Sequence, residues 1–355
     1  MKTGPLLKIG RYEMKEEIAS GGMATVYRAV QTGHGDVRSV VAVKVLHSHL
    51  AREREFQKMF LEEARIGAML QHRCLLNVLD YGEEEGVSYI VTEYFPSLSL
   101  EQLVGKVKKV PLNEALFCLA EAAEGLHALH EAKDLEGKKL ELVHRDVSPH
   151  NVLVGTDGRI KLIDFGIVKR KDPTEQTRTG IVKGKCRYMS PEQAAGKALG
   201  QPSDIYSLGI SFLRIVSGAR PHGAGDTGEI MARARSGLDP VKLVRRAKLP
   251  KEVGELVGRI VAAKPGDRPK SALEVAKEAR TLLASYNPSY DVHDFEKWMT
   301  TVGQKPKRKR GAKAPAAKPG RPLYTGPGIH PKWIFYGLGT LFLIALLAHL
   351  LNQWF

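Results

Sequence analysis

The spacing of apolar residues predicts two differently built regions in the first part of the chain. Early segments alternate polar and apolar positions, which is typical of strands, whereas later segments repeat apolar residues with helical spacing. Strands are expected at 12–18, 23–31, 39–46 and 88–95. Helices are expected at 52–71, at 112–132 and over much of 204–284. The pattern therefore predicts a small β-rich region followed by a larger helical region.

A polar loop between short apolar runs carries the strongest chemical signal. The run His144-Arg145-Asp146-Val147-Ser148-Pro149-His150-Asn151 precedes one apolar run, and Asp164-Phe165-Gly166 follows the next. Phosphoryl transfer needs a carboxylate that orients the attacking hydroxyl and accepts its proton, together with oxygen ligands for Mg²⁺. Asp146 suits the first task, and Asn151 and Asp164 suit the second as metal ligands.

These motifs, in this order, resemble the eukaryotic-type serine/threonine protein kinases, in particular their bacterial, myxobacterial-like members. The resemblance covers about residues 10–285. It implies an α+β, bilobal protein kinase fold with a β-rich N-lobe at about 10–95 and a helical C-lobe at about 96–285. It also implies transfer of the γ-phosphate of ATP to Ser or Thr hydroxyls of protein substrates, with Mg²⁺ or, as a substitute, Mn²⁺ as the cofactor.

The resemblance further implies the nucleotide site. Lys44 closes an apolar strand and corresponds to the lysine that holds the α- and β-phosphates; Glu63 is its expected partner, with Glu62 as the alternative. Ala19 and Ala24 stand where the family's glycine-rich loop usually has its first and third glycines, so weaker phosphate contacts are expected. The main chain of Glu93 to Phe95 is expected to pair with adenine. The full set is Ile18, Ala19, Ser20, Gly21, Gly22, Met23, Ala24, Val26, Ala42, Lys44, Glu93, Phe95, Asn151 and Asp164.

The segment from Gly166 to Glu192 resembles an activation loop. Autophosphorylation is expected on Thr177 and Thr179, because such threonines are common sites in bacterial relatives and Arg145 can pair with a phosphate there. By the same resemblance, Glu192 is expected to pair with Arg268 in a structural role.

Two positions depart from the family in a linked way. Ser148 stands where serine/threonine kinases carry a catalytic-loop lysine, and Lys185 stands where they carry a threonine. Since the two positions are neighbours in the folded family, Lys185 is interpreted as a catalytic residue that supplies the missing charge. A Lys185 side chain pointing to solvent or to an acidic substrate is the alternative. The same departures leave open a pseudokinase, a scaffold that binds nucleotide or partners without efficient transfer.

The charge distribution separates the C-terminal tail from the rest. After Glu296 the tail has ten Lys and Arg and no Asp or Glu, which leaves 44 basic and 39 acidic residues before it, a balance of +5. The three cysteines are far apart, without metal-ligand spacing, as expected for reduced thiols. The N-terminus lacks a signal-peptide pattern, so the first 296 residues are expected in the cytosol.

The tail itself has two expected parts. Residues 286–331 are read as a basic linker rich in Pro, Gly and Ala, and 332–354 as a transmembrane helix. The 19 residues Trp333–Leu351 carry no charge and would span about 28 Å as a helix, close to the ~30 Å hydrocarbon core. The expectation is a single-pass inner-membrane protein with a cytoplasmic kinase domain, lipid contacts through helix and linker, self-association for autophosphorylation, and no nucleic-acid partner.

Overall fold

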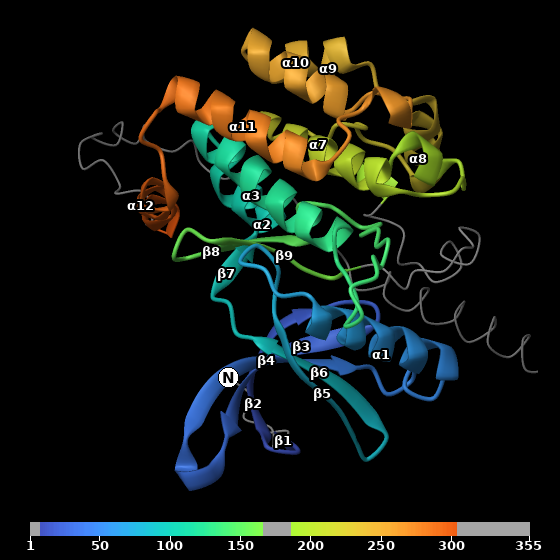
Figure 1. Ribbon diagram of the computed structural model, residues 1–355, viewed down its shortest axis with the longest axis vertical. Coiled ribbons are helices and arrows are strands. Elements are labelled where there is room, and N and C mark those ends of the chain that lie inside the picture. Colours follow the sequence, from blue (N-terminus) through green and yellow to red (C-terminus); the bar gives the residue numbers. More distant parts are fainter. Residues whose placement is uncertain (1–7, 166–185, 304–355) are drawn as a thin grey trace, which may run out of the picture. The chain divides into compact units, whose positions relative to one another are not determined.

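The alternating segments form an antiparallel sheet in the computed structural model, which describes residues 8–165 and 186–303. The sheet has the strand order β1-β2-β3-β4-β6-β5 and lies at the lower end of Figure 1. Its strands are β1 (Lys8–Ile9), β2 (Tyr12–Ser20), β3 (Ala24–Thr32), β4 (Arg38–Leu46), β5 (Val78–Glu84) and β6 (Val87–Glu93). The four expected strands are present, with ends within two residues of the predicted ones.

The two faces of β4 are buried in different clusters, because successive side chains on a strand point to opposite faces. Val41 and Val43 pack with Tyr12 on one face. Leu46 packs on the other face with Phe60 of helix α1 (Arg54–Met69). Lys44 shares the face of Leu46, so the register of β4 points this lysine toward the side of the sheet that α1 covers.

The second lobe is helical and is drawn in green to orange in the upper part of Figure 1. Its helices are α2 (Leu100–Val107), α3 (Leu112–His130), α6 (Pro191–Ala194), α7 (Gln201–Ser217), α8 (Thr227–Ser236), α9 (Pro240–Ala247), α10 (Lys251–Ile260) and α11 (Ala272–Tyr286). Helix α7 is buried over most of its length, between α3 and α10. A Cβ at Gly209 would lie 2.3 Å from the side chain of Ile260, so the glycine allows α7 and α10 to approach closely.

A small three-stranded sheet lies next to the helical lobe and positions the polar loop found in the sequence. Its strands β7 (Ser97–Ser99), β8 (Val152–Gly155) and β9 (Ile160–Leu162) are antiparallel. The loop from His144 to Asn151 enters β8, and Asp164 follows β9. Because β8 and β9 are adjacent, the two candidate metal ligands are brought to the same end of this sheet.

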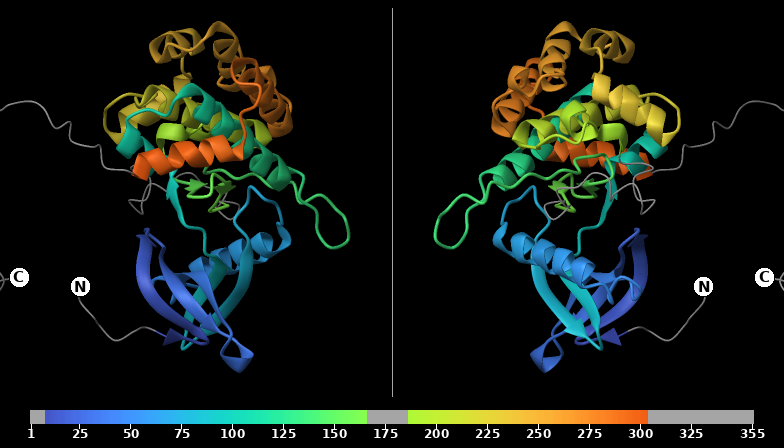
Figure 2. Two further views of the ribbon diagram at one scale, coloured as in Figure 1. Left: turned by 90° about the vertical axis from the view of Figure 1, so that its left-hand side faces the viewer. Right: turned by 90° about the vertical axis from the view of Figure 1, so that its right-hand side faces the viewer.

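The connection before the polar loop forms a surface turn. Asp134 accepts hydrogen bonds from the backbone N–H groups of Glu136 and Lys138, and Lys133 pairs with Lys139. In Figure 2 this loop, coloured green, stands away from the helices.

A linker was expected at 286–331. Its first part instead contains helix α12 (Val292–Gly303), which continues the fold. Phe295 is fully buried, and its ring lies 5.0 Å from that of Phe117 on α3. The compact unit of the chain extends to Lys305, next to the Pro306 at which the composition changes. Within residues 8–165 and 186–303, no helix is long and apolar enough to cross a membrane. The predicted span at 332–354 lies outside these ranges.

Candidate active site

The polar loop is closed by its own hydrogen bonds. Asn151 donates from its backbone N–H to the Ser148 carbonyl (2.9 Å) and from its side-chain Nδ2 to the Asp146 carbonyl (2.8 Å). Asp146 and Asn151 are both largely buried, at 8% and 6% exposed. The backbone of Asp146, the candidate proton acceptor, and the side chain of Asn151, a candidate metal ligand, are thus fixed relative to each other by the same turn.

Asp204 on α7 holds this loop through its carboxylate. Its carboxylate accepts hydrogen bonds from the backbone N–H groups of His144 (2.7 Å) and Arg145 (2.8 Å), and it contacts His130 Nε2 (2.9 Å). Arg145 has φ +64°, a conformation that costs free energy in a non-glycine residue. The buried carboxylate therefore stabilises a strained backbone next to Asp146.

The segment after β9 is joined to the polar loop. Ile163 donates its backbone N–H to the Asn151 carbonyl (3.0 Å), and His144 Nε2 contacts the Ile163 carbonyl (3.1 Å). The ring of Phe165 meets the ring of His144 edge-on, with centroids 6.0 Å apart. Asp164 lies between Ile163 and Phe165 and has φ +54°. Because both neighbours contact the polar loop, the backbone of Asp164 is held beside it.

Lys44 connects the two lobes at this site. Its Nζ lies 2.6 Å from Glu63 Oε1 on α1 and 3.0 Å from Asp164 Oδ1. Burial alone would lower the pKa of Lys44, but the carboxylates of Asp164 and Glu63 raise it above its usual value. The lysine is therefore a fixed cation. Glu62, the alternative partner, instead lies 3.8 Å from Arg65 on the exposed side of α1.

The side chains of Asn151 and Asp164 fit a hard divalent cation, which prefers oxygen ligands. The Nδ2 of Asn151 is occupied by the Asp146 carbonyl, which leaves its Oδ1 as the acceptor for a cation. Asp164 has one carboxylate oxygen on Lys44, and its side chain is 49% exposed. These two residues would hold Mg²⁺, and Mn²⁺ has the same ligand preference.

The glycine-rich turn joins β2 to β3 at Gly21, Gly22 and Met23, and the Gly21 N–H donates to the Ala24 carbonyl (3.0 Å). Ala24 itself is 6% exposed and packs in the cluster under the turn, so its side chain is not presented to a nucleotide. Ala19 and Ser20 pair with β3 and are exposed.

A feature of this turn that the sequence did not indicate is a side-chain connection to the loop after β4. Thr25 Oγ1 contacts His47 Nε2 (3.0 Å), and the His47 N–H donates to the Met23 carbonyl (3.0 Å). These contacts fix the position of the turn over the cleft.

The cleft side of the sheet is defined by strand register. Val26 lies directly opposite Lys44 and Ala42 opposite Thr92, so Val26, Ala42 and Lys44 share one face. Ile18 is 46% exposed near the end of β2. Val26 and Ala42, expected in the nucleotide site, therefore lie on the same face of the sheet as Lys44.

The side chains of Glu93 and Phe95 point away from that cleft. Glu93 Oε1 accepts hydrogen bonds from Lys161 Nζ (2.8 Å) and from the Asn77 N–H (2.9 Å). Glu93, Lys161 and Asn77 line a polar groove of about 520 Å³. Phe95 is buried against Gly155, with the Arg159 guanidinium 5.6 Å from its ring. A contact of 93–95 with a base would therefore fall to the main chain, where the Glu93 N–H already donates to the Asn77 carbonyl (3.1 Å) and Ser97 Oγ donates to the Phe95 carbonyl (2.8 Å).

Lys161 was not singled out in the sequence. It is 2% exposed and donates to Glu93 and to the Leu75 carbonyl (3.0 Å). The sequence could have indicated this residue, because Lys161 lies in an apolar strand just before Asp164. A lysine in such a strand is buried and requires hydrogen-bond acceptors.

Three predicted residues cannot be placed at this site. Lys185, Thr177 and Thr179 lie outside the described residues. Ser148, the expected neighbour of Lys185, is 4% exposed within the polar loop.

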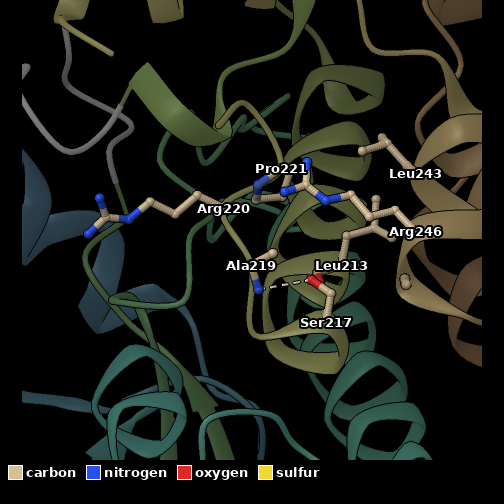
Figure 3. Close-up of a pocket in the computed structure, with 8 residues that line it drawn as sticks. Leu213, Ser217, Ala219, Arg220, Pro221, Leu243 and Arg246 are labelled. Atoms are coloured by element: carbon tan, nitrogen blue, oxygen red, sulfur yellow. Dashed lines mark hydrogen bonds between the residues drawn. The ribbon is translucent and has the colours of Figure 1, made fainter. Parts of the chain in front are cut away.

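A separate small pocket lies at the end of α7, lined by Leu213, Ser217 and Leu243 (Figure 3). It contains none of the residues of the candidate active site, and we assign it no role in the chemistry.

The arrangement matches a known family. A model described as the protein kinase domain matches residues 12–280 of the chain. The chain belongs to the protein kinase family. The kinase domain expected at about 10–285 contains the matched range.

Three curated relatives of this kinase come from bacteria. The chain is 36% identical over 288 residues to a protein named tyrosine-protein kinase MasK of Myxococcus xanthus, covering 79% of this chain and 44% of MasK. It is 36% identical over 284 residues to the serine/threonine-protein kinase PknA of Mycobacterium tuberculosis, covering 79% of this chain and 63% of PknA. It is 30% identical over 272 residues to the serine/threonine-protein kinase PrkC of Bacillus subtilis, covering 77% and 40%.

A solved kinase structure has the same fold. The kinase domain of PknI from Mycobacterium tuberculosis aligns with a TM-score of 0.58 and 25% identity, covering 79% of this chain and 99% of that one. The kinase chain described here spans about half the length of the curated relatives it matches.

Proposed function

We propose that the chain is an ATP-dependent serine/threonine protein kinase that transfers the γ-phosphoryl group to a protein hydroxyl. The observation that carries this proposal is the position of Lys44, whose Nζ joins Glu63 of α1 to Asp164. In protein kinases the lysine–glutamate pair and the metal-ligating aspartate must both be in place for transfer.

Each residue then has one task. Lys44, positioned by Glu63, binds the α- and β-phosphates of ATP with its ammonium group. Asp146 accepts the hydrogen bond of the acceptor hydroxyl and takes its proton as the new O–P bond forms and the bond to ADP breaks. Asn151 and Asp164 would hold Mg²⁺, which would supply positive charge next to the phosphates.

The contacts favour this reading over a pseudokinase. Lys44, Asp146, Asn151 and Asp164 are all present and are linked through hydrogen bonds among themselves or with Glu63. The departures at Ala19, Ala24 and Ser148 leave those contacts unchanged.

The test is phosphoryl transfer by the purified full-length chain. With ATP labelled on its γ-phosphate and Mg²⁺, we expect label in protein as phosphothreonine or phosphoserine, and none with Asp146→Asn. Asp157→Asn, a change at an exposed turn carboxylate paired with Arg159, is the matched control and should keep activity. Absence of transfer by the unchanged chain contradicts the proposed function. Phosphotyrosine as the sole product contradicts the Ser/Thr assignment and would match the name of MasK.

We also propose autophosphorylation on Thr177 and Thr179, with self-association of two chains bringing one activation segment to the other's site. Arg145, next to Asp146, is the residue that the family resemblance pairs with a phosphate added there. Mass spectrometry of active protein should find both threonines modified and should find neither modified in Asp146→Asn. Two unmodified threonines in the active protein contradict this proposal.

We further propose that residues 332–354 tether the kinase to the inner membrane with the kinase domain in the cytoplasm. The support is the uncharged run Trp333–Leu351 after a basic segment, Lys307–Arg310. Full-length protein should remain with membranes in high salt, and deletion of 331–355 should release it. A chain with Lys307–Arg310 changed to Gln is the control and should stay bound, since screened charge alone would wash off. Release of the full-length chain by salt contradicts the tether.

A further inference from the structure

The segment from Cys186 to Gln193 lies directly against the loop that carries Asp146. The Gln193 side chain donates to the Arg145 carbonyl (2.9 Å), and the ring of Tyr188 meets the ring of His150 edge-on at 6.4 Å. A protein substrate whose hydroxyl reaches Asp146 must therefore pass over this segment and the elements packed on it. One of these is helix α8, where Ile230 packs with Cys186.

Four arginines lie on this segment, on α8 and on the loop before α8, and we call them the acceptor-side arginines: Arg187, Arg220, Arg233 and Arg235. Three of them donate to main-chain carbonyls: Arg187 to Gly223 (2.9 Å), Arg233 to Ala224 (2.6 Å) and Arg235 to Ala194 (2.7 Å). Arg220 is exposed, and in Figure 3 its side chain extends away from the other residues drawn.

The acceptor-side arginines differ from other arginines of the same lobe in their lack of carboxylate partners. Arg214 is paired with Glu101 at 2.6 Å, and Arg268 with Glu192 at 2.6 Å. Among the residues that the structure describes, the acceptor-side arginines have one carboxylate within 4 Å, that of Glu229, which is 3.9 Å from Arg233 and 61% exposed. Their positive charge is therefore largely uncompensated.

Nearby acidic side chains are engaged elsewhere. Asp226 accepts the Glu229 N–H (2.9 Å) at the N-terminus of α8, where the helix dipole already favours a negative charge. Glu101 and Glu192 belong to the ion pairs with Arg214 and Arg268. Among the described residues, no carboxylate lies within 4 Å of the guanidinium of Arg187 or Arg220.

A buried histidine lies close to two of the acceptor-side arginines. His222 is 2% exposed, and neither ring nitrogen has a hydrogen-bond partner within the described residues. Burial first, and then the charges of Arg233 and Arg187, lower the pKa of His222 to about 4. The ring is therefore neutral at physiological pH, and the two arginines remain the cations that a ligand would meet.

From this charge distribution we infer that the kinase selects acceptor segments that carry acidic residues close to the phosphorylated hydroxyl. The inference rests on the proposed kinase function and names its substrate class. Arg187 and Arg233 would contact the acidic side chain, because each has guanidinium N–H groups beyond the one it gives to the main chain. Met189 and Met231, partly buried beside Cys186, offer an apolar surface for the neighbouring substrate residue.

The test uses synthetic peptides with a single threonine in an alanine and glycine background. One residue at a time near the threonine is changed to Asp, Asn or Lys, and kcat/KM is measured with the full-length chain. At one or two positions we expect Asp to exceed its isostere Asn by about 1.5- to 5-fold, the range of an exposed ion pair. Lys at the same positions should fall below Asn, and the Asp preference should shrink as salt is added.

Two variants locate the preference. In Arg187→Gln and in Arg233→Gln the Asp/Asn ratio should fall toward one. Arg245→Gln, on the exposed side of α9, is the matched control and should keep the ratio of the unchanged chain. Since the ratio compares two peptides on the same protein, it is insensitive to partial loss of folded enzyme. A second readout is binding of a fluorescent Asp peptide to Asp146→Asn, which should weaken when Arg187→Gln is added.

The outcomes separate this inference from the proposed function. A chain that phosphorylates the Asn and Asp peptides equally at every position is a kinase without the inferred selectivity, and the inference is then wrong. A ratio that persists in both arginine variants also overturns it. A chain that labels no protein in the radiolabel assay contradicts the proposed function itself, whereas peptide binding that depends on Arg187 would still support the acidic-segment site.

Discussion

Arg268 and Glu192 are 76 positions apart in the sequence and form a doubly hydrogen-bonded ion pair inside the helical lobe. Arg268 Nη1 lies 2.6 Å from Glu192 Oε1, and Nη2 lies 2.9 Å from Oε2. The two side chains are 0% and 9% exposed. The pairing expected from the family resemblance is present. It fixes the end of the segment from Cys186 to Gln193 to the loop before α11.

Removing one partner should leave a buried charge unpaired. We expect Arg268→Gln to lower the free energy of unfolding by about 3–5 kcal/mol, measured by urea denaturation. Arg259→Gln, which breaks the exposed pair with Glu278, is the control and should cost at most about 1 kcal/mol. Similar losses in the two variants would show that burial does not set the contribution of the Arg268 pair.

The same pair predicts a pH dependence. Burial alone would raise the pKa of Glu192, but hydrogen bonds from Arg268 and Ser203 lower it from 4.5 to about 2. A carboxyl whose pKa is lower in the folded state stabilises the fold above its unfolded pKa and loses that contribution as pH falls. Relative to Glu192→Gln, the unchanged chain should therefore lose on the order of 3 kcal/mol between about pH 4.5 and 2. A difference in unfolding free energy that stays constant over this range would contradict the assignment.

The Lys44–Glu63 contact predicts unequal effects of two adjacent glutamates. Glu63→Gln should lower kcat by about 10- to 100-fold, because Lys44 loses the group that positions it. Glu62→Gln, a change of the exposed neighbour, should stay within about twofold. Initial rates with labelled ATP measure both, and equal effects would remove the positioning role of Glu63.

Helix α12 predicts that the folded domain extends beyond the family match. Phe295→Ala should cost about 3–5 kcal/mol of unfolding free energy, because its buried ring packs on Phe117 and Trp298. Lys297→Ala on the exposed side of the same helix should be close to neutral. Thermal unfolding of both variants checks this, and a neutral Phe295→Ala would mean that α12 does not stabilise the lobe.

The sequence predicts that Lys185 supplies the charge of the catalytic-loop lysine that Ser148 replaces, and this remains a prediction. Lys185→Ala should lower kcat by about 10² to 10³ with little change in the KM for ATP, the effect of removing one preorganised charge. Lys183→Ala is the neighbouring control, and Ser148→Lys with Lys185→Thr should recover part of the activity. Near-normal kcat in Lys185→Ala would end the idea that this lysine supplies the missing charge.

The sequence by itself determined the bilobal kinase fold and four strands of the larger sheet, and it pointed to the residues of the candidate phosphoryl-transfer site. Asp146, Asn151 and Asp164 were identifiable because their chemistry is set by residue type and by short spacings within two turns. The strands of the sheet were identifiable because a period of two along the chain is a local property.

Tertiary structure decided what depends on partners far along the chain. The choice between Glu62 and Glu63 required the rotation of α1 against β4, since adjacent helical residues point about 100° apart. The burial of Ala24, the outward side chain of Glu93 and the packing of α12 likewise follow from contacts between distant segments. The uncompensated charge of Arg187 could not be seen in the sequence, because opposite charges cancel only when folding places them within a few ångströms of each other.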